Sequence, residues 1–235
     1  MTPDPRAIHP QSRMHGGGRL SFRRRVREVE DDGTLPCILG GEDPPPLRDL
    51  VRGNPTAIEI EVGPGKGTFL LAAAQNRPDT FLVGIEASVA YAKFAAQRVR
   101  DAGLRNAVLL VDNARLYLQD RVPEGALRAV HVYYPDPWPK RRHRKRRFFV
   151  EETPDVLYRC LAPDGYLLVA TDNAAYAGQI VALMGAAPGF ARDRAEEERL
   201  RDAPPGHGFS PTNFERKYLQ EGRILRRYAF RKVST

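Results

Sequence analysis

Apolar and polar residues alternate or recur along residues 57–187 with two periods, that of a strand and that of a helix. The stretch AIEIEVG at 57–63 alternates, which predicts a strand. Residues 67–77 predict a helix that stops before Pro78, and residues 88–103 predict one with Ser88 as N-cap and Gly103 at its end. Further strands are predicted at 80–86, 107–113, 126–135 and 162–173, helices at 147–161 and 174–187, and one or two tail strands at 208–215 and 222–230.

Strands that alternate with helices predict an α/β fold with a doubly wound, mostly parallel sheet. Residues 1–53 hold many Pro, Gly and Arg without sustained periodicity, so we expect a basic, partly disordered arm before a domain at 54–235. Ligands of such sheets bind at the carboxyl ends of the strands. The candidate residues all lie at such ends: Gly63 to Gly67, Glu86, Asn113, Asp136 and Thr171-Asp172.

The composition narrows the class of protein. A net charge of +8 over 235 residues favours a polyanionic partner, nucleic acid before membrane. No apolar stretch approaches the ~20 residues of a membrane helix, and the N-terminus lacks the apolar region of a secretory signal. Two distant cysteines fit a reducing cytoplasm. His131, His143 and His207 lack metal-ligand spacing, so we expect no metal. Monomer and homodimer stay equally open.

The glycines of EIEVGPGKGTF predict a ligand loop between the first strand and the first helix. Gly63, Gly65 and Gly67 permit positive φ and close approach of a ligand to the backbone. A Walker A loop fails because Lys66 is followed by glycine, and the dinucleotide fingerprint is one residue short. Glu61, two residues before the first glycine, suits a cationic ligand better than a pyrophosphate.

This segment resembles the S-adenosyl-L-methionine loop of class I methyltransferases. In that class an acidic residue at the end of the second strand binds the ribose diol, and Glu86 of GIEAS stands at that place. The end of the third strand contacts the adenine, which implies Asn113 first and Asp112 second. The resemblance also implies a seven-stranded, Rossmann-like sheet. A tight turn without a ligand is the structural alternative for the glycines.

The segment after the fourth strand, YYPDPWPKRRHRKRR, carries a more specific resemblance. PDPW partly matches the motif of amino methyltransferases, but Trp138 replaces its second proline. The longer string is similar to that of the tRNA (guanine-N7-)-methyltransferase family, and so are ATDN (170–173) and TNFERKYLQEGRI (212–224). The resemblance covers about residues 57–231. It implies transfer of methyl to N7 of the variable-loop guanine, position 46, of tRNA.

Guanine N7 has an in-plane lone pair and no proton to lose, so methyl transfer needs alignment rather than a strong base. Asp136 can hydrogen-bond the N1 and N2 edge of guanine or hold the amino end of the cofactor, and flanking prolines stiffen it. Capping the following helix is its structural alternative. Trp138 either walls the base pocket or packs.

Seven Lys/Arg and one His fill positions 140–147. Lys140 is the first cation after the rigid segment and is expected to reach the substrate, while the run beyond it would grip phosphates: Arg142, His143, Arg144, Lys145, Arg146 and Arg147. A solvated face is the alternative. By resemblance, substrate contacts also come from Asp172, Thr212, Asn213, Phe214 and Glu215. The competing functions are an amino-group nucleic-acid methyltransferase and a non-catalytic RNA-binding protein on the same fold.

Overall fold

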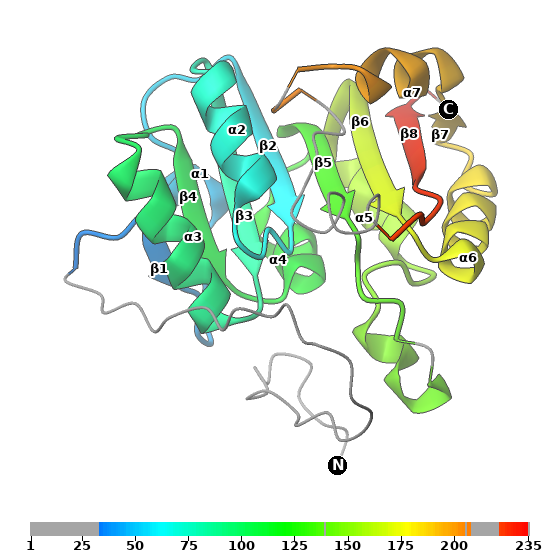
Figure 1. The fold of residues 1–235 in the computed structure, drawn as a ribbon, viewed down its shortest axis with the longest axis horizontal. Coiled ribbons are helices and arrows are strands. Elements are labelled where there is room, and N and C mark those ends of the chain that lie inside the picture. Colours follow the sequence, from blue (N-terminus) through cyan, green and yellow to red (C-terminus); the bar gives the residue numbers. More distant parts are fainter. Residues whose placement is uncertain (1–32, 139, 205, 208–220, 235) are drawn as a thin grey trace.

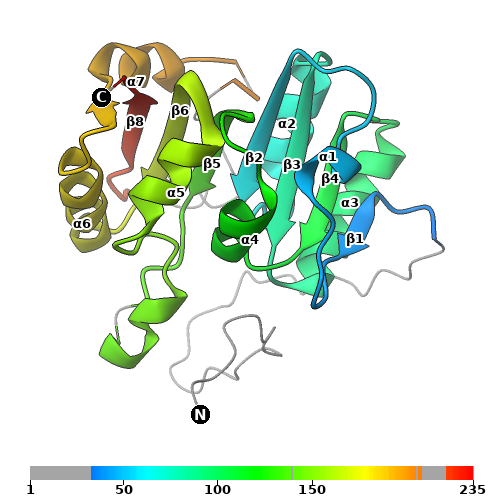
Figure 2. The same ribbon diagram turned by 180° about the vertical axis from the view of Figure 1, so that it is seen from behind.

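The computed structural model describes residues 33–138, 140–204, 206–207 and 221–234, and the sheet that they form has eight strands. The strand order is β1-β4-β3-β2-β5-β6-β8-β7, and the pairs from β1 to β6 are parallel while β8 runs antiparallel to both neighbours. Figures 1 and 2 show helices on both faces of this sheet. The elements are β1 (Cys37–Leu39), α1 (Leu47–Leu50), β2 (Ala57–Val62), α2 (Thr68–Asn76), β3 (Thr80–Glu86), α3 (Val89–Asp101), β4 (Ala107–Val111), α4 (Ala114–Arg121), β5 (Leu127–Tyr133), the 3-10 helix η1 (Arg141–Arg146), α5 (Thr153–Cys160), β6 (Leu161–Thr171), α6 (Ala174–Gly185), β7 (Phe190–Arg192), α7 (Arg194–Arg201) and β8 (Arg226–Lys232).

Two apolar clusters fill the layers on either side of the sheet. One joins the buried faces of α2, α3 and α7 to the sheet, and the other joins those of α1, α4, α5 and α6. Helix α4 packs on the sheet through a single buried stripe, formed by Ala114, Tyr117 and Leu118 at i, i+3, i+4 spacing. The doubly wound α/β class predicted from the sequence is confirmed.

Several boundaries differ from the prediction. The described residues form eight strands rather than the expected seven, and one of the unexpected strands, Cys37–Leu39, adds parallel to β4 inside the range expected to be an arm. Residues 1–32 of that range lie outside the described residues, as does the predicted strand at 208–215. The helix expected at 147–161 begins only at Thr153, and the basic run before it forms η1. Helices α4 and α7 and the short strand β7 were not predicted.

The strand order reverses between β2 and β5. From β2 the chain proceeds through β3 to β4 on one side, and then crosses to β5 and β6 on the other. The loops leaving the carboxyl ends of β2 and β5 therefore diverge and leave a crevice, which is where open α/β sheets bind ligands. Those two loops are the glycine loop and the PDPW loop, which we define as Tyr134–Trp138. In Figure 1 η1 projects beyond this end of the sheet.

A buried polar chain ties the two central strands together beneath that crevice. Glu59 of β2 accepts a hydrogen bond from Arg77 Nη1 at 2.6 Å and lies 2.8 Å from His131 Nε2 on β5. His131 Nδ1 lies 2.9 Å from the Tyr133 hydroxyl, and Phe69 packs on the imidazole with ring centroids 4.5 Å apart. Burial alone would raise the pKa of Glu59, but His131 and Arg77 outweigh it and lower that pKa to about 2.

Glu59→Gln should lower the free energy of unfolding by about 3 kcal/mol, because it leaves Arg77 with a mostly buried charge and no carboxylate. Urea unfolding at neutral pH measures the change. Asp49→Asn is the matched control, since Asp49 pairs with Arg48 only at the surface and its loss should cost less than about 1 kcal/mol. Equal losses in the two variants would contradict a structural role for the buried pair.

Candidate active site

The glycine loop has a left-handed backbone at each of its three glycines. The φ angles of Gly63, Gly65 and Gly67 are 66°, 55° and 68°, which a residue with a Cβ adopts only at a cost. A Cβ added at Gly63 or Gly65 would meet no atom within 4 Å, so both face open space, whereas one at Gly67 would lie 2.9 Å from the Cβ of Ala95. The first two glycines therefore leave room for a ligand, and the third lets α2 approach α3.

Two carboxylates line this loop. Glu86 at the end of β3 accepts hydrogen bonds from Gly65 N at 3.0 Å and Ser88 N at 2.9 Å. Ser88 is the N-cap residue of α3, as predicted, but its side chain makes no capping hydrogen bond. Glu61 is buried, and its Oε2 has no hydrogen-bond partner. Burial raises the pKa of Glu61 to about 8. The hydrogen bond from the Leu70 backbone N–H lowers this pKa, and the negative charge of Glu86 raises it further. A buried carboxylate whose Oε2 has no hydrogen-bond partner among the described residues, beside open glycine backbone, fits a cationic ligand.

The two polar residues that follow β4, Asp112 and Asn113, have different hydrogen-bond roles. The Asn113 side-chain oxygen accepts from the backbone N–H groups of Arg115 and Leu116, so it caps α4. Asp112 is buried and accepts from the Asn113 N–H at 2.6 Å. The sequence placed an adenine contact here on Asn113 first; the structure adds that its oxygen is already engaged in the cap.

The PDPW loop brings Asp136 to the same crevice. Tyr134 and Trp138, at its two ends, have positive φ of 53° and 38°, each a strained conformation that costs about 1–3 kcal/mol. Tyr134 N donates to Ala170 O at 2.7 Å, which ties the loop to β6. The Asp136 side chain is exposed. Burial is the main cause that raises the pKa of Glu86, and the negative charge of Asp136 raises it further, so the two carboxylates lie close enough to repel each other. Glu152 occupies the N-cap position of α5, so the capping role that was the alternative for Asp136 falls to another residue there.

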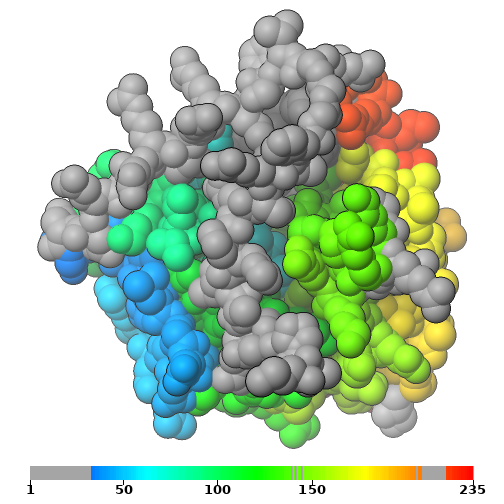
Figure 3. All heavy atoms as spheres, turned by 90° about the horizontal axis from the view of Figure 1, so that it is seen from below, coloured from blue at the N-terminus to red at the C-terminus, as the bar shows by residue number. Residues whose placement is uncertain are grey.

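Beyond the loop, η1 presents exposed cations. Lys140, Arg142, Lys145 and Arg146 are exposed, and the Arg144 side chain lies outside the described part of the structure. Trp138 packs edge-on against His143 with ring centroids 5.6 Å apart, and Arg146 covers its ring at 5.1 Å. Figure 3 looks onto this side, where the green segment around η1 stands forward next to the yellow and red C-terminal elements.

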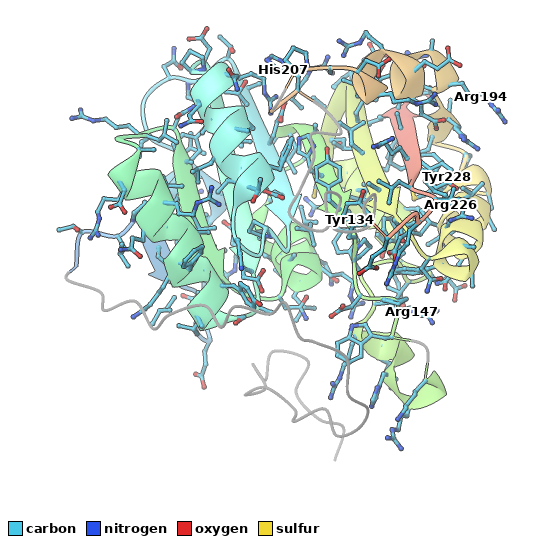
Figure 4. The ribbon with its side chains drawn as sticks, viewed as in Figure 1. Tyr134, Arg147, Arg194, His207, Arg226 and Tyr228 are labelled. Atoms are coloured by element: carbon cyan, nitrogen blue, oxygen red, sulfur yellow. The ribbon has the colours of Figure 1, made fainter. Side chains whose placement is uncertain are left out.

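Arg147 departs from the rest of the run. It is half-buried and donates to the carbonyls of Pro137 and Trp138, and Figure 4 labels it where the projecting segment joins the sheet domain. Arg147 therefore differs in its surroundings from the exposed cations with which it was predicted to grip phosphates. Its role was missed because the partners include Gln179 and Tyr176, which are about thirty residues away along the chain.

The predicted substrate contact Asp172 directly follows the end of β6. Asp172 accepts from Arg223 Nη1 at 2.6 Å, and Arg223 also pairs with Glu221 at 2.8 Å. The segment before Glu221 is where the sequence placed further contacts, and Thr212, Asn213, Phe214 and Glu215 lie outside the described residues. The structure thus brings Asp172 to the same edge of the sheet as the other candidates and pairs it with a cation from the C-terminal segment.

Arg98 is a site residue that the sequence did not reveal. From α3 it donates to Lys66 O at 2.5 Å and so holds the glycine loop from outside, with a pKa lowered by burial. Its position 32 residues after the loop leaves no local signal. Among the described residues no group of three or more His, Cys, Asp or Glu is placed to hold a metal ion. No helix in the described ranges is long and apolar enough to cross a bilayer.

A sheet of this order, a glycine loop after β2 and an acidic residue at the end of β3 define a class I methyltransferase. A family model described as "Putative methyltransferase" matches residues 55–227. The tRNA (guanine-N(7)-)-methyltransferase of Acidithiobacillus ferrooxidans is 33% identical over 185 residues, covering 77% of this chain and 78% of the relative. That of Rhizobium etli is 32% identical over 221 residues, covering 92% and 95%. The chain belongs to the tRNA (guanine-N7-)-methyltransferase family.

Among solved structures, that of the (4+2)-cyclase SpnF superposes on the chain with a TM-score of 0.51. The two sequences are 18% identical, and the match covers 77% of this chain and 76% of the cyclase. At that identity the likeness shows the fold alone.

Glu61→Gln should stabilise the ligand-free protein at pH 8 more than at pH 5. With a pKa raised from 4.5 to about 8, Glu61 contributes stability that is full below pH 4.5 and is lost as the pH rises through 8. The variant removes that loss, so its advantage over wild type should grow by about 2 kcal/mol or more between the two pH values. Denaturant unfolding at both pH values measures it, with the exposed Glu124→Gln as control. An advantage independent of pH would contradict the argument.

Proposed function

We propose that the protein transfers the methyl group of S-adenosyl-L-methionine to N7 of a guanine in tRNA, at position 46 of the variable loop. The observation that carries the proposal is the junction of β2 and β5, where a carboxylate-lined glycine loop meets Asp136 and the exposed cations of η1 follow at once. A cation-binding cradle beside a polyanion-binding surface is what a sulfonium donor and an RNA acceptor need. The family relationship supports the same reaction.

The cradle fits the cofactor by its chemistry. When bound, S-adenosyl-L-methionine supplies an electrophilic methyl on a positively charged sulfur. Glu61 would offer its unpartnered oxygen to the cationic amino-acid end, which favours its ionised form. Glu86 uses two backbone donors but retains lone pairs that can accept from ribose hydroxyls. Gly63 and Gly65 would lie against the cofactor because no atom of the described residues lies within 4 Å of where a Cβ would stand at either position.

The residues around the acceptor would align it rather than activate it. N7 of guanine is unprotonated at neutral pH, so no residue needs to remove a proton before methyl transfer. Asp136 would accept hydrogen bonds from the N1 and N2 edge of guanine and thereby fix the ring in its plane. Orientation of this kind is worth several orders of magnitude in rate. Asp172, directly after β6, and Lys140, directly before η1, would add substrate contacts together with Thr212, Asn213, Phe214 and Glu215.

The backbone of the tRNA would lie along η1. Exposed Arg and Lys side chains at the edge of an active site neutralise phosphates and release counterions, which makes affinity depend on salt. Trp138 is covered by Arg146 and flanked by His143, so in this arrangement it supports the cationic surface by packing. A tRNA substrate would also place the protein in the cytoplasm.

Incubation of the protein with labelled S-adenosyl-L-methionine and unmodified tRNA should give label in 7-methylguanosine after nuclease digestion. A tRNA with adenine at position 46 should receive none. Asp136→Ala should reduce turnover at saturating substrates by at least about 100-fold while tRNA still binds. Label in a methylated adenine would instead indicate an amino methyltransferase, and tRNA binding without transfer or cofactor binding would indicate an RNA-binding protein.

Replacing both Arg142 and Lys145 by Gln should raise the KM for tRNA and flatten its salt dependence, with little change in kcat. Each phosphate contact contributes about −0.7 to −0.9 to the slope of log affinity against log salt, so the slope should become shallower by roughly 1.5. Arg52→Gln with Arg105→Gln removes the same charge from loops that precede β2 and β4, at the opposite edge of the sheet. If that control changes the slope equally, η1 is not the contact surface.

A further inference from the structure

The PDPW loop cannot hold its own shape by backbone hydrogen bonds. Pro135, Pro137 and Pro139 have no N–H group, and the Tyr134 N–H donates to β6, so only Asp136 and Trp138 keep an N–H group that could donate within the loop. Both ends of the loop also have left-handed backbone, at Tyr134 and Trp138. A strained conformation of this kind persists only where the surroundings impose it. One end is imposed by β6 through the bond from Tyr134 N to Ala170 O.

The other end is held by Arg147. Its Nε donates to Pro137 O at 2.7 Å and its Nη2 to Trp138 O at 3.1 Å. Both carbonyls follow Asp136 directly, so the guanidinium fixes the backbone immediately after the carboxylate. A planar guanidinium supplies such donors in one rigid fork, which an ammonium group does not.

Helix α6 in turn holds Arg147. The Arg147 Nη1 donates to Gln179 Oε1, and the guanidinium lies over the ring of Tyr176 at 5.3 Å. The Gln179 amide also donates to Phe149 O at 3.3 Å, and the Tyr176 hydroxyl accepts from Phe149 N at 3.4 Å. The same two side chains therefore secure both the guanidinium and the chain that follows it. Arg147 connects the loop to a helix that begins at the end of β6.

We propose that Arg147 is a positioning residue that fixes Asp136 and Trp138, and that it does not act as one of the cations that bind tRNA phosphate. The inference rests on the proposed function for its kinetic consequence, but its structural part concerns the protein alone. It divides the basic run in two: Arg142, Lys145 and Arg146 face solvent, whereas Arg147 faces the loop.

Arg147→Lys separates these roles because it keeps the charge and removes the fork. We expect kcat with saturating tRNA and cofactor to fall by about 10- to 100-fold, since small displacements of an aligning group are costly. The KM for tRNA should change less than about threefold and the salt slope should stay as in wild type. A phosphate contact would give the opposite pattern, with kcat retained and the KM raised in Arg147→Gln but restored in Arg147→Lys.

The tryptophan reports on the loop without any substrate. Trp138 is the only tryptophan, and Arg147 binds its carbonyl, so Arg147→Lys should shift its emission and increase its quenching by acrylamide. Arg142→Lys, which alters an exposed cation in η1, is the matched control and should do neither. Unchanged emission and quenching in Arg147→Lys would overturn the proposal, even if the wild-type protein proved to methylate another substrate.

Gln179→Ala keeps the test decisive if Arg147→Lys fails to fold. It leaves Arg147 in place but removes its anchor on α6, so it should reproduce the same direction of change in kcat and in Trp138 quenching, with a smaller size. Thermal unfolding would confirm that the variant is folded. A folded Gln179→Ala protein with wild-type kcat and wild-type quenching would show that α6 does not hold the loop through Arg147.

Discussion

The crowding of carboxylates at one end of the sheet is the constraint around which the rest of the molecule is arranged. Glu61, Glu86 and Asp136 come from the ends of β2, β3 and β5, and in the ligand-free protein burial and mutual repulsion raise the pKa of the first two. Such a group is unfavourable unless a cation joins it. The parallel strands are packed on both faces, and this packing holds the three carboxylates together despite their repulsion.

Glu59 and Glu61 show how one strand can carry a structural and a functional carboxylate. The two are separated by one residue on β2, so they share a face of the sheet. Glu59 has Arg77 and His131 as partners and a pKa of about 2, while Glu61 has an unpartnered oxygen and a pKa of about 8. The paired carboxylate joins β2 to β5, and the other keeps one buried oxygen without a partner among the described residues, next to the glycine loop. Residue type does not distinguish them; the neighbours do.

The basic run makes the same distinction among cations. Arg142, Lys145 and Arg146 are exposed on η1, where solvent and a polyanion are the available partners. Arg147 points toward the domain, where its guanidinium donates hydrogen bonds to two backbone carbonyls and to α6. A rigid loop built from prolines and a cationic surface built from arginines thus meet at one residue. Under the proposed function, that arrangement would keep Asp136 fixed while the surface beyond it accommodates RNA.

The alternation of strands and helices, the glycine loop and the acidic residues at strand ends could all be predicted from the sequence, because these are local patterns of period and turn chemistry. Its resemblance to a tRNA methyltransferase family was also confirmed. Only the tertiary structure decided that Cys37–Leu39 joins the sheet, that Asn113 caps α4 and that Arg147 holds the PDPW loop. Each depends on which backbone or side-chain groups the fold brings together. The partner strand of β1 is about seventy residues away along the chain, and the α6 residues that contact Arg147 are about thirty residues away. A sequence shows the chemistry of each side chain and the period at which side chains recur. Which groups become hydrogen-bond partners depends on how the elements pack in the folded protein.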